Sequence, residues 1–167
     1  ILALAHRLAD AAGATIMPYF RQRIAVANKP MVIEGREVFD PVTEADKNAE
    51  KAIRAIIERE RPDDAILGEE FGATPGKNAY RWVLDPVDGT RAFINGRHEW
   101  GSLISLEENG KPVIGILDQP SIGERLIRVN GTAPLRFPGP DLPPRRRQGE
   151  TPPAPLPRAP RPHRTLS

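Results

Sequence analysis

The stretch "WVLDPVDGT", residues 82–90, places two aspartates three positions apart at the end of an apolar run. Pro86 biases Asp85 away from helical backbone geometry and keeps the strand extended to its last residue. Gly89 follows the second aspartate, Asp88, and permits backbone angles that other residues resist. The sequence therefore predicts two carboxylates on a stiff turn at a strand end, an arrangement suited to hard cations and, where a helix follows, to phosphate.

An ordinary surface turn explains this motif equally well when the motif is taken alone. A calcium-binding EF-hand loop is excluded, because counting back from Gly89 as the sixth loop position puts Leu84 where the first acidic ligand belongs.

Two further acidic groups shift the balance towards a metal site. Glu69 and Glu70 lie in "GEEF" at the end of another expected strand, and Asp46 with Thr43 lies in "PVTEADK" at the start of an expected helix. Each group alone is explained more simply as a solvated turn or a helix cap. Together, on a chain without cysteine, they predict a Mg²⁺ site built from oxygen ligands.

The rest of the chain supplies the elements that would carry these residues. Three-to-four spacing of apolar residues predicts an amphipathic helix from residue 2 onward and a second one after Thr43, ended by Pro62. A hairpin is expected over residues 29–40, and Asn109-Gly110 is a strong hairpin signal between two later strands. The remaining strands are expected within residues 65–72, 80–85, 100–108, 112–119 and 125–130. This order predicts an α+β fold, a layered α/β sandwich with a mostly antiparallel sheet.

Composition divides the chain after residue 130. Residues 131–167 hold 11 of the 19 prolines and no valine or isoleucine. Proline removes the donors of a sheet ladder, and too few apolar residues remain to form a core. We therefore expect a folded lobe over residues 1–130 and an Arg/Pro-rich disordered tail over residues 131–167.

Charge follows the same division. The tail contains seven arginines, whereas residues 1–130 hold 17 basic and 20 acidic side chains, so the basic isoelectric point does not describe the folded part. Nucleic-acid binding is weakly supported, since the run of three arginines at 145–147 is short and Phe137 is the one aromatic residue of the tail.

Several classes of protein are excluded or favoured by composition alone. No apolar run reaches the roughly 18 residues that a membrane span needs. The absence of cysteine excludes a disulfide framework and thiolate chemistry, which is compatible with a cytoplasmic location. The chain begins with Ile1 rather than methionine, so we expect a fragment or a trimmed product.

Four other conspicuous residues have structural interpretations. Trp82 and Trp100 are expected in the core. His6 is expected on a helix surface, and Asp118 is expected in a turn.

The three motifs together carry a family resemblance. "DPVTEADK", "LGEEFG" and "WVLDPVDGTRAFINGR" resemble the successive signatures of the inositol monophosphatase superfamily of Mg²⁺-dependent, lithium-sensitive phosphatases. The resemblance covers about residues 1–130, and "DGTRAFINGRHEWGSLISL" is most similar to the histidinol-phosphate phosphatase branch. It implies the sugar-phosphatase type of α/β sandwich, a small phosphorylated substrate, two or three Mg²⁺ ions and a homodimer.

The resemblance also implies a role for each matching position. The implied metal ligands are the side chains of Glu69, Asp85 and Asp88 and the carbonyl of Val87. Thr90 and Asp46 would orient the attacking water and help to deprotonate it, and the N–H groups of Gly89 and Thr90 would hold the phosphate. Arg91 is a weaker candidate for contact with the substrate.

The resemblance is incomplete. A third metal aspartate, in a Trp-Asp motif, and the second lobe of the family have no counterpart in this sequence. We therefore expect weak metal binding and little turnover from the chain as given, and we hypothesise that the tail is an out-of-frame reading of a GC-rich gene.

The alternatives to histidinol phosphate are inositol phosphates and other small sugar or nucleotide phosphates. A rival of another class is an inactive lobe whose basic tail binds nucleic acid, anionic surfaces or proline-binding modules.

Overall fold

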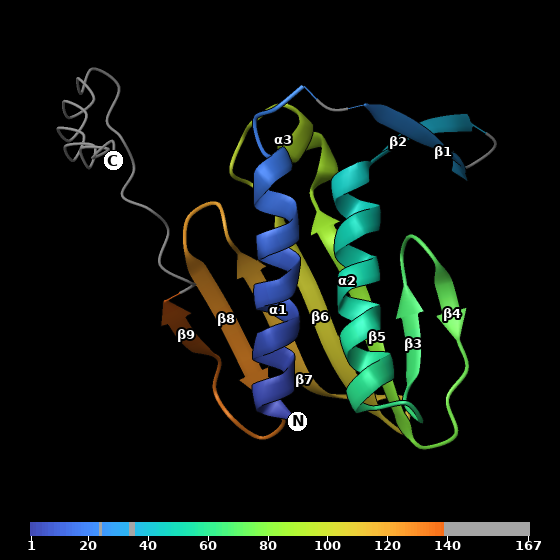
Figure 1. Cartoon of the computed structure of the whole chain (residues 1–167), viewed down its shortest axis with the longest axis vertical. Coiled ribbons are helices and arrows are strands. Elements are labelled where there is room, and N and C mark those ends of the chain that lie inside the picture. Colours follow the sequence, from blue (N-terminus) through green and yellow to red (C-terminus); the bar gives the residue numbers. More distant parts are fainter. Residues whose placement is uncertain (24, 34–35, 139–167) are drawn as a thin grey trace, which may run out of the picture.

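Two long helices lie side by side across one face of a seven-stranded sheet (Figure 1). The computed structural model describes residues 1–23, 25–33 and 36–138. In chain order the elements are α1 (Leu2–Ile16), the short 3₁₀ helix η1 (Met17–Tyr19), β1 (Val26–Ile33), β2 (Arg36–Thr43), α2 (Glu44–Glu60), β3 (Ala65–Gly68), β4 (Gly72–Thr74), β5 (Tyr80–Asp88), α3 (Thr90–Ile94), β6 (Gly101–Glu108), β7 (Lys111–Gln119), β8 (Glu124–Val129) and β9 (Leu135–Pro138). This order confirms the α+β class.

The sheet has the strand order β4-β3-β5-β6-β7-β8-β9, and β1 and β2 form a separate hairpin. All neighbours pair antiparallel except β3 and β5, which run parallel, with Gly68 opposite Leu84. Since parallel strands end at the same edge of a sheet, the residues that follow β3 and β5 meet there.

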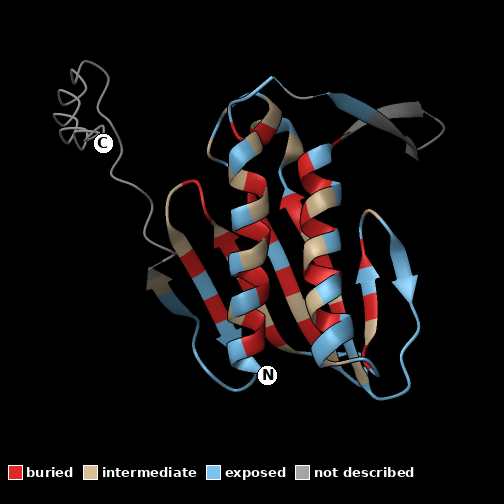
Figure 2. Ribbon diagram, in the orientation of Figure 1, coloured by how far each residue is buried: buried red, intermediate tan, exposed pale blue. Residues whose placement is uncertain are grey.

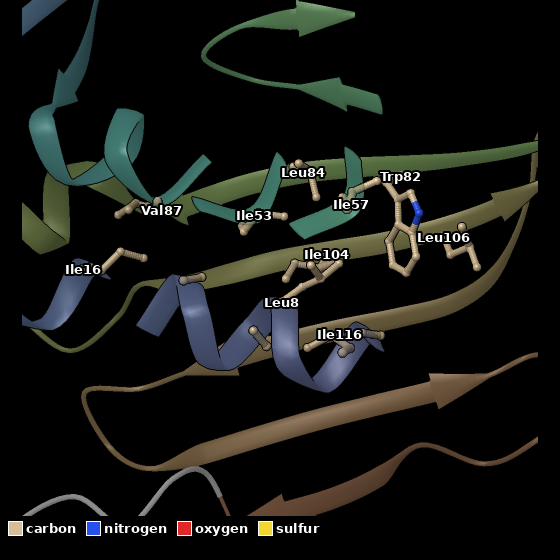
Figure 3. Packing of buried hydrophobic residues seen from close by; sticks show 14 of the residues in the cluster. Leu8, Ile16, Ile53, Ile57, Trp82, Leu84, Val87, Ile104, Leu106 and Ile116 are labelled. Carbon is tan, nitrogen blue, oxygen red and sulfur yellow. The ribbon is translucent and has the colours of Figure 1, made fainter. Parts of the chain in front are cut away.

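The core lies between the helices and the sheet. Buried positions form one stripe along each helix and alternate along the strands, as Figure 2 shows. Side chains of α1, α2 and strands β5–β7 pack together in this layer (Figure 3). Trp82 is fully buried there and donates its indole N–H to Asp64 at 3.0 Å. Both Trp82 and Trp100 are thus core residues, as predicted.

The hairpin turn between β6 and β7 is confirmed at Asn109-Gly110. Both residues have positive φ, 51° and 75° respectively, as a type I′ turn requires. An added Cβ at Gly110 would meet nothing within 4 Å, so only the backbone conformation demands glycine at this position.

Replacing Gly110 with alanine is therefore expected to lower the free energy of unfolding by about 1–2 kcal/mol, the cost of left-handed backbone for a residue with a Cβ. Chemical denaturation of both proteins measures the difference. Lys111→Ala, an exposed change at the next position, is the control and is expected to leave the stability unaltered. Equal stability of Gly110→Ala and the unaltered chain would contradict this account of the turn.

The prediction that the sheet ends before residue 131 is wrong. Residues 135–138 form β9, which pairs antiparallel with β8 at the sheet edge. An edge strand needs ladder partners on one side only, and Pro138 is the last residue of this strand, where its missing N–H costs least. The ring of Phe137 also packs edge-on against His6, with ring centroids 5.3 Å apart. The remainder of the predicted tail, 139–167, lies outside the described residues.

Asp118 is not the turn residue that the sequence suggested. It is fully buried in β7 and accepts a hydrogen bond from Arg125 at 2.7 Å. Arg125 also donates to Asp10 of α1 at 2.8 Å, so this ion-pair group fastens α1 to the sheet. Burial raises the pKa of Asp118, and Arg125 opposes that shift. His6 likewise is half-buried beside Arg125 rather than on an open helix surface.

Among the helices of the described residues, none has the length and the apolar character needed to cross a membrane.

Candidate active site

The end of β3 and the end of β5 form a hollow of about 260 Å³. Its lining consists of Glu69, Asp85, Val87, Asp88, Gly89, Thr90 and Arg91. The parallel pairing creates this neighbourhood, because the N–H of Glu69 donates to the carbonyl of Leu84 at 3.1 Å, directly before Asp85. Every lining residue is one of the candidates that the sequence singled out. Of the residues to which the resemblance assigns a role, Asp46 lies outside this lining, and its carboxylate accepts a hydrogen bond from the Thr90 hydroxyl.

Asp85 is the most perturbed acid of the site. Its pKa is raised to about 8, first by burial, then by a hydrogen bond with the Glu69 side chain and by the negative charges of Glu69 and Asp88. The Oδ1 atom of Asp85 is buried without a hydrogen-bond partner. A buried carboxylate oxygen in this condition carries a cost that a cation would remove.

The donor set of the hollow suits a hard cation. Carboxylate and carbonyl oxygens are the ligands that Mg²⁺ prefers, and the side chains of Glu69 and Asp85 and the carbonyl of Val87 supply them. Asp88 lines the same hollow but is exposed at its rim. Within the described residues, no three acidic or histidine side chains are already gathered as a metal-binding cluster. The unpartnered Oδ1 of Asp85 is therefore the observation that favours a cation here.

Asp46 takes part in a helix cap and in the site at the same time. Its Oδ2 accepts hydrogen bonds from the N–H of Thr43, at 2.9 Å, and from the Thr43 hydroxyl, closing a capping box at the start of α2. Its Oδ1 accepts from the hydroxyl of Thr90 at 3.3 Å. Burial raises the pKa of Asp46, while the hydrogen bonds from Thr43 and Thr90 oppose the shift. One carboxylate thus caps the helix through Oδ2 and contacts the site through Oδ1.

The Thr90 hydroxyl lies between two acceptors. It is 2.9 Å from the carbonyl oxygen of Val87 and 3.3 Å from Asp46. A hydroxyl has a single proton, so it donates to one of them at a time and can turn from one to the other.

The groups from Asp85 to Thr90 lie on the last residues of β5, where its register against β6 shifts, and on the start of α3, and contacts on two sides hold this segment. Gly89 has φ 88°, and an added Cβ would lie 2.6 Å from the carbonyl oxygen of Glu99. On the other side, the hydroxyl of the buried Ser102 donates to the carbonyl of Pro86 at 2.7 Å. The first turn of α3 begins at Thr90, where N–H groups have no acceptor within the helix.

Sequence analysis missed Glu50 and Arg54. Both are buried on α2. Glu50 contacts the turn directly after Glu69, and Arg54 contacts Gly72 at the start of β4. Their signal was a Glu–Arg pair four residues apart on a helix face otherwise lined by Ala49 and Ile53.

Comparison with known proteins shows the family to which this chain belongs. Residues 1–148 match the Inositol monophosphatase family, eighteen residues further than the predicted lobe boundary at 130. The chain is 43% identical over 131 residues to the bifunctional phosphatase IMPL2, chloroplastic, of Arabidopsis thaliana, a match covering 77% of this chain and 36% of that protein. It is 42% identical over 123 residues to a histidinol-phosphatase of Chlorobaculum parvum, with 74% and 45% covered.

A solved structure shares the same architecture. An inositol monophosphatase from Zymomonas mobilis superimposes with a TM-score of 0.63 at 40% sequence identity, covering 82% of this chain and 50% of that one. The chain thus spans half or less of the length of each of these three proteins.

Proposed function

Because this chain belongs to the inositol monophosphatase family, we propose that it supplies the metal- and phosphate-binding part of a Mg²⁺-dependent phosphomonoesterase. The observation that carries the proposal is the buried, unpartnered oxygen of Asp85 beside Glu69, in a hollow that also contains Thr90.

Glu69, Asp85 and the carbonyl of Val87 would hold the cation, with Asp88 available from the rim. Bound Mg²⁺ would lower the pKa of a water molecule and neutralise charge on the phosphoryl oxygens. Two or three ions per site are what the resemblance implies, and the described residues offer ligands chiefly around Asp85.

Asp46 would accept the proton of the attacking water, and Thr90 would orient that water. The raised pKa of Asp46 makes its carboxylate a better proton acceptor than an exposed aspartate. The Thr90 hydroxyl can accept from the water while it donates to Asp46, and it would thereby fix the orientation of that water. The N–H groups at Gly89 and Thr90 would receive the phosphate, and Arg91 lines the same hollow.

As the substrate we favour histidinol phosphate, whose leaving alcohol is histidinol. The support is the sequence after Asp88 and the similarity to a histidinol-phosphatase. Inositol phosphates are the second candidate, because a solved inositol monophosphatase is similar at 40% identity. A cytoplasmic location and a homodimer belong to the same proposal.

Release of inorganic phosphate by the full chain of 167 residues tests the proposal, with histidinol phosphate and inositol 1-phosphate as substrates, each with Mg²⁺ and with a chelator. We expect slow, Mg²⁺-dependent release, faster with histidinol phosphate. Thr90→Val, which keeps the shape but removes the hydroxyl, is expected to lower the rate by about 100-fold or more.

Equal release in the presence of the chelator would contradict the metal-dependent mechanism. Faster release from inositol 1-phosphate would reverse the choice of substrate. No release from either compound, by protein whose fold is verified by circular dichroism, would confine the chain to binding.

A further inference from the structure

The buried carboxylate of Glu50 meets the backbone of the turn that follows Glu69. One of its oxygens accepts from the N–H of Glu70 at 2.7 Å, and the other accepts from the N–H of Phe71 at 3.2 Å. Glu50 is fully buried in α2, so its carboxylate depends on protein donors rather than on water. The two peptide N–H groups directly after Glu69 are thus held by one side chain from another element.

Arg54 completes the attachment one helical turn later. Its Nε donates to Glu50 at 2.7 Å, and its two terminal nitrogens donate to the Thr74 hydroxyl, at 2.9 Å, and to the carbonyl of Gly72. A planar guanidinium can span three acceptors in this way, which a lysine cannot do. Glu50 is therefore neutralised by a partner that also binds β4, at its first and last residues.

Gly68 gives independent support for a close and specific approach. A Cβ at this position would lie 1.8 Å from an oxygen of Glu50 and 2.7 Å from Arg54. The last residue of β3 must consequently lack a side chain, because the Glu50 carboxylate occupies that space.

Glu69 is fixed from both directions as a result. Its own N–H is bonded to the carbonyl of Leu84, the residue before Asp85, and the next two N–H groups are bonded to Glu50. The separation between the Glu69 and Asp85 backbones is thus set by the sheet on one side and by α2 on the other.

We propose that Glu50 and Arg54 are positioning residues for the metal site, which hold Glu69 at the place where its carboxylate and that of Asp85 can share one cation. The proposal rests on the function proposed above. It adds that the placement of Glu69 depends on a buried ion pair that binds the backbone of the turn after it.

The test compares Glu50→Gln with the unaltered full chain by two measurements. The first is hydrogen exchange of the Glu70 and Phe71 amides in metal-free protein, which reports whether the turn is held. The second is the dissociation constant for Mn²⁺, an ion with similar oxygen preference, measured by titration. We expect faster exchange at both amides and a dissociation constant raised about 10-fold, the size typical of lost outer contacts to a metal ligand.

Asp64→Asn is the matched control. Asp64 is also a buried carboxylate paired with an arginine, Arg61, but it lies before β3, at the opposite end of that strand from Glu69. A purely structural role for Glu50 predicts that both variants lose stability and neither changes the affinity for Mn²⁺ of the folded protein. The positioning role predicts that only Glu50→Gln changes it.

Arg54→Lys serves where Glu50→Gln fails to fold, since it keeps the charge beside Glu50 and loses the contacts to Thr74 and Gly72. An unaltered Mn²⁺ affinity in the folded variant would overturn the positioning role. Absence of Mn²⁺ binding by the unaltered chain would instead overturn the proposed function, and the exchange data would still report whether Glu50 holds the turn.

Discussion

Replacing Asp85 with asparagine is expected to lower the affinity of the chain for divalent cations by about 100-fold or more, because loss of contacts that merely orient a ligand already costs about 10- to 100-fold. The substitution is nearly isosteric, but it removes the negative charge and gives one side-chain position to an N–H₂ donor. That donor can bond to Glu69, so the second carboxylate is diverted from a cation as well. Metal-dependent phosphate release is expected to disappear with the binding.

The same substitution is expected to stabilise the metal-free protein at pH 8. In the unaltered chain, burial, Glu69 and Asp88 all disfavour the ionised form of Asp85, and asparagine is never ionised. For Asp85→Asn we therefore expect a lower affinity in the titration with Mn²⁺ and a higher melting temperature in a chelator. A loss of both binding and metal-free stability would contradict the site, since it would mean that Asp85 mainly supports the fold.

Asp63→Asn is the control for this experiment. Asp63 is an exposed aspartate whose carboxylate pairs loosely with Lys77 at 3.6 Å, outside the hollow. Its substitution is expected to change neither the affinity for Mn²⁺ nor the stability measurably.

The stability of the metal-free protein is expected to fall as the pH rises from about 4 to about 8. The pKa of Asp85 is about 8 in the folded chain and about 4 when unfolded, so between these values the folded state keeps a proton that the unfolded state loses. The stabilisation from the proton on Asp85 is thus fully present below the pKa of the unfolded state, and it is lost as the pH rises through the pKa of the folded state. Because Asp85 keeps some contact with solvent, the effect is smaller than full burial would give.

Melting temperatures in a chelator between pH 5 and pH 8.5 measure this dependence. We expect a decrease of about 5 °C or more over that range for the unaltered chain, and a shallower decrease for Asp85→Asn. Burial also raises the pKa values of Asp46 and Asp118, which contribute in the same direction in both proteins. Only the difference between the two curves therefore belongs to Asp85, and parallel curves would contradict its raised pKa.

Adding Mg²⁺ is expected to cancel the loss of stability that the metal-free protein shows as the pH rises towards 8. A cation binds the ionised carboxylate, so its stabilising effect grows as the pH approaches 8. Mg²⁺ that stabilised the protein equally at pH 5 and pH 8 would not be bound through Asp85.

The sequence predicted which residues line the hollow better than it predicted the contacts that support it. The Asp-Pro-X-Asp-Gly turn fixes its own backbone through Pro86 and Gly89, so local rules sufficed to place Asp85 and Asp88 at a strand end. The pairing of β3 with β5 was beyond such rules, because a parallel partner is decided by packing between distant segments.

Buried polar residues were the main failure. Asp118 and Glu50 were a turn residue and an unremarked helix residue in sequence, yet each is buried with an arginine partner. A carboxylate is normally read as exposed, and its burial depends on an arginine that the fold brings to it. The strand at residues 135–138 was missed for a related reason: a proline-rich segment can still pair along one edge when the edge is available.

The positions of Asp46 and Glu50 on one helix limit how the length of this chain can vary. They lie four residues apart on α2, and each reaches a different part of the site, Asp46 through Thr90 and Glu50 through the turn after Glu69. Each residue of a helix turns the direction of the side chain by about 100°, so one residue inserted or deleted between them would direct one of the two away from its target. An insertion among the three residues between Asp46 and Glu50 is therefore expected to disturb the site, whereas an insertion in the Asn109-Gly110 turn, outside the hollow, is expected to leave it in place.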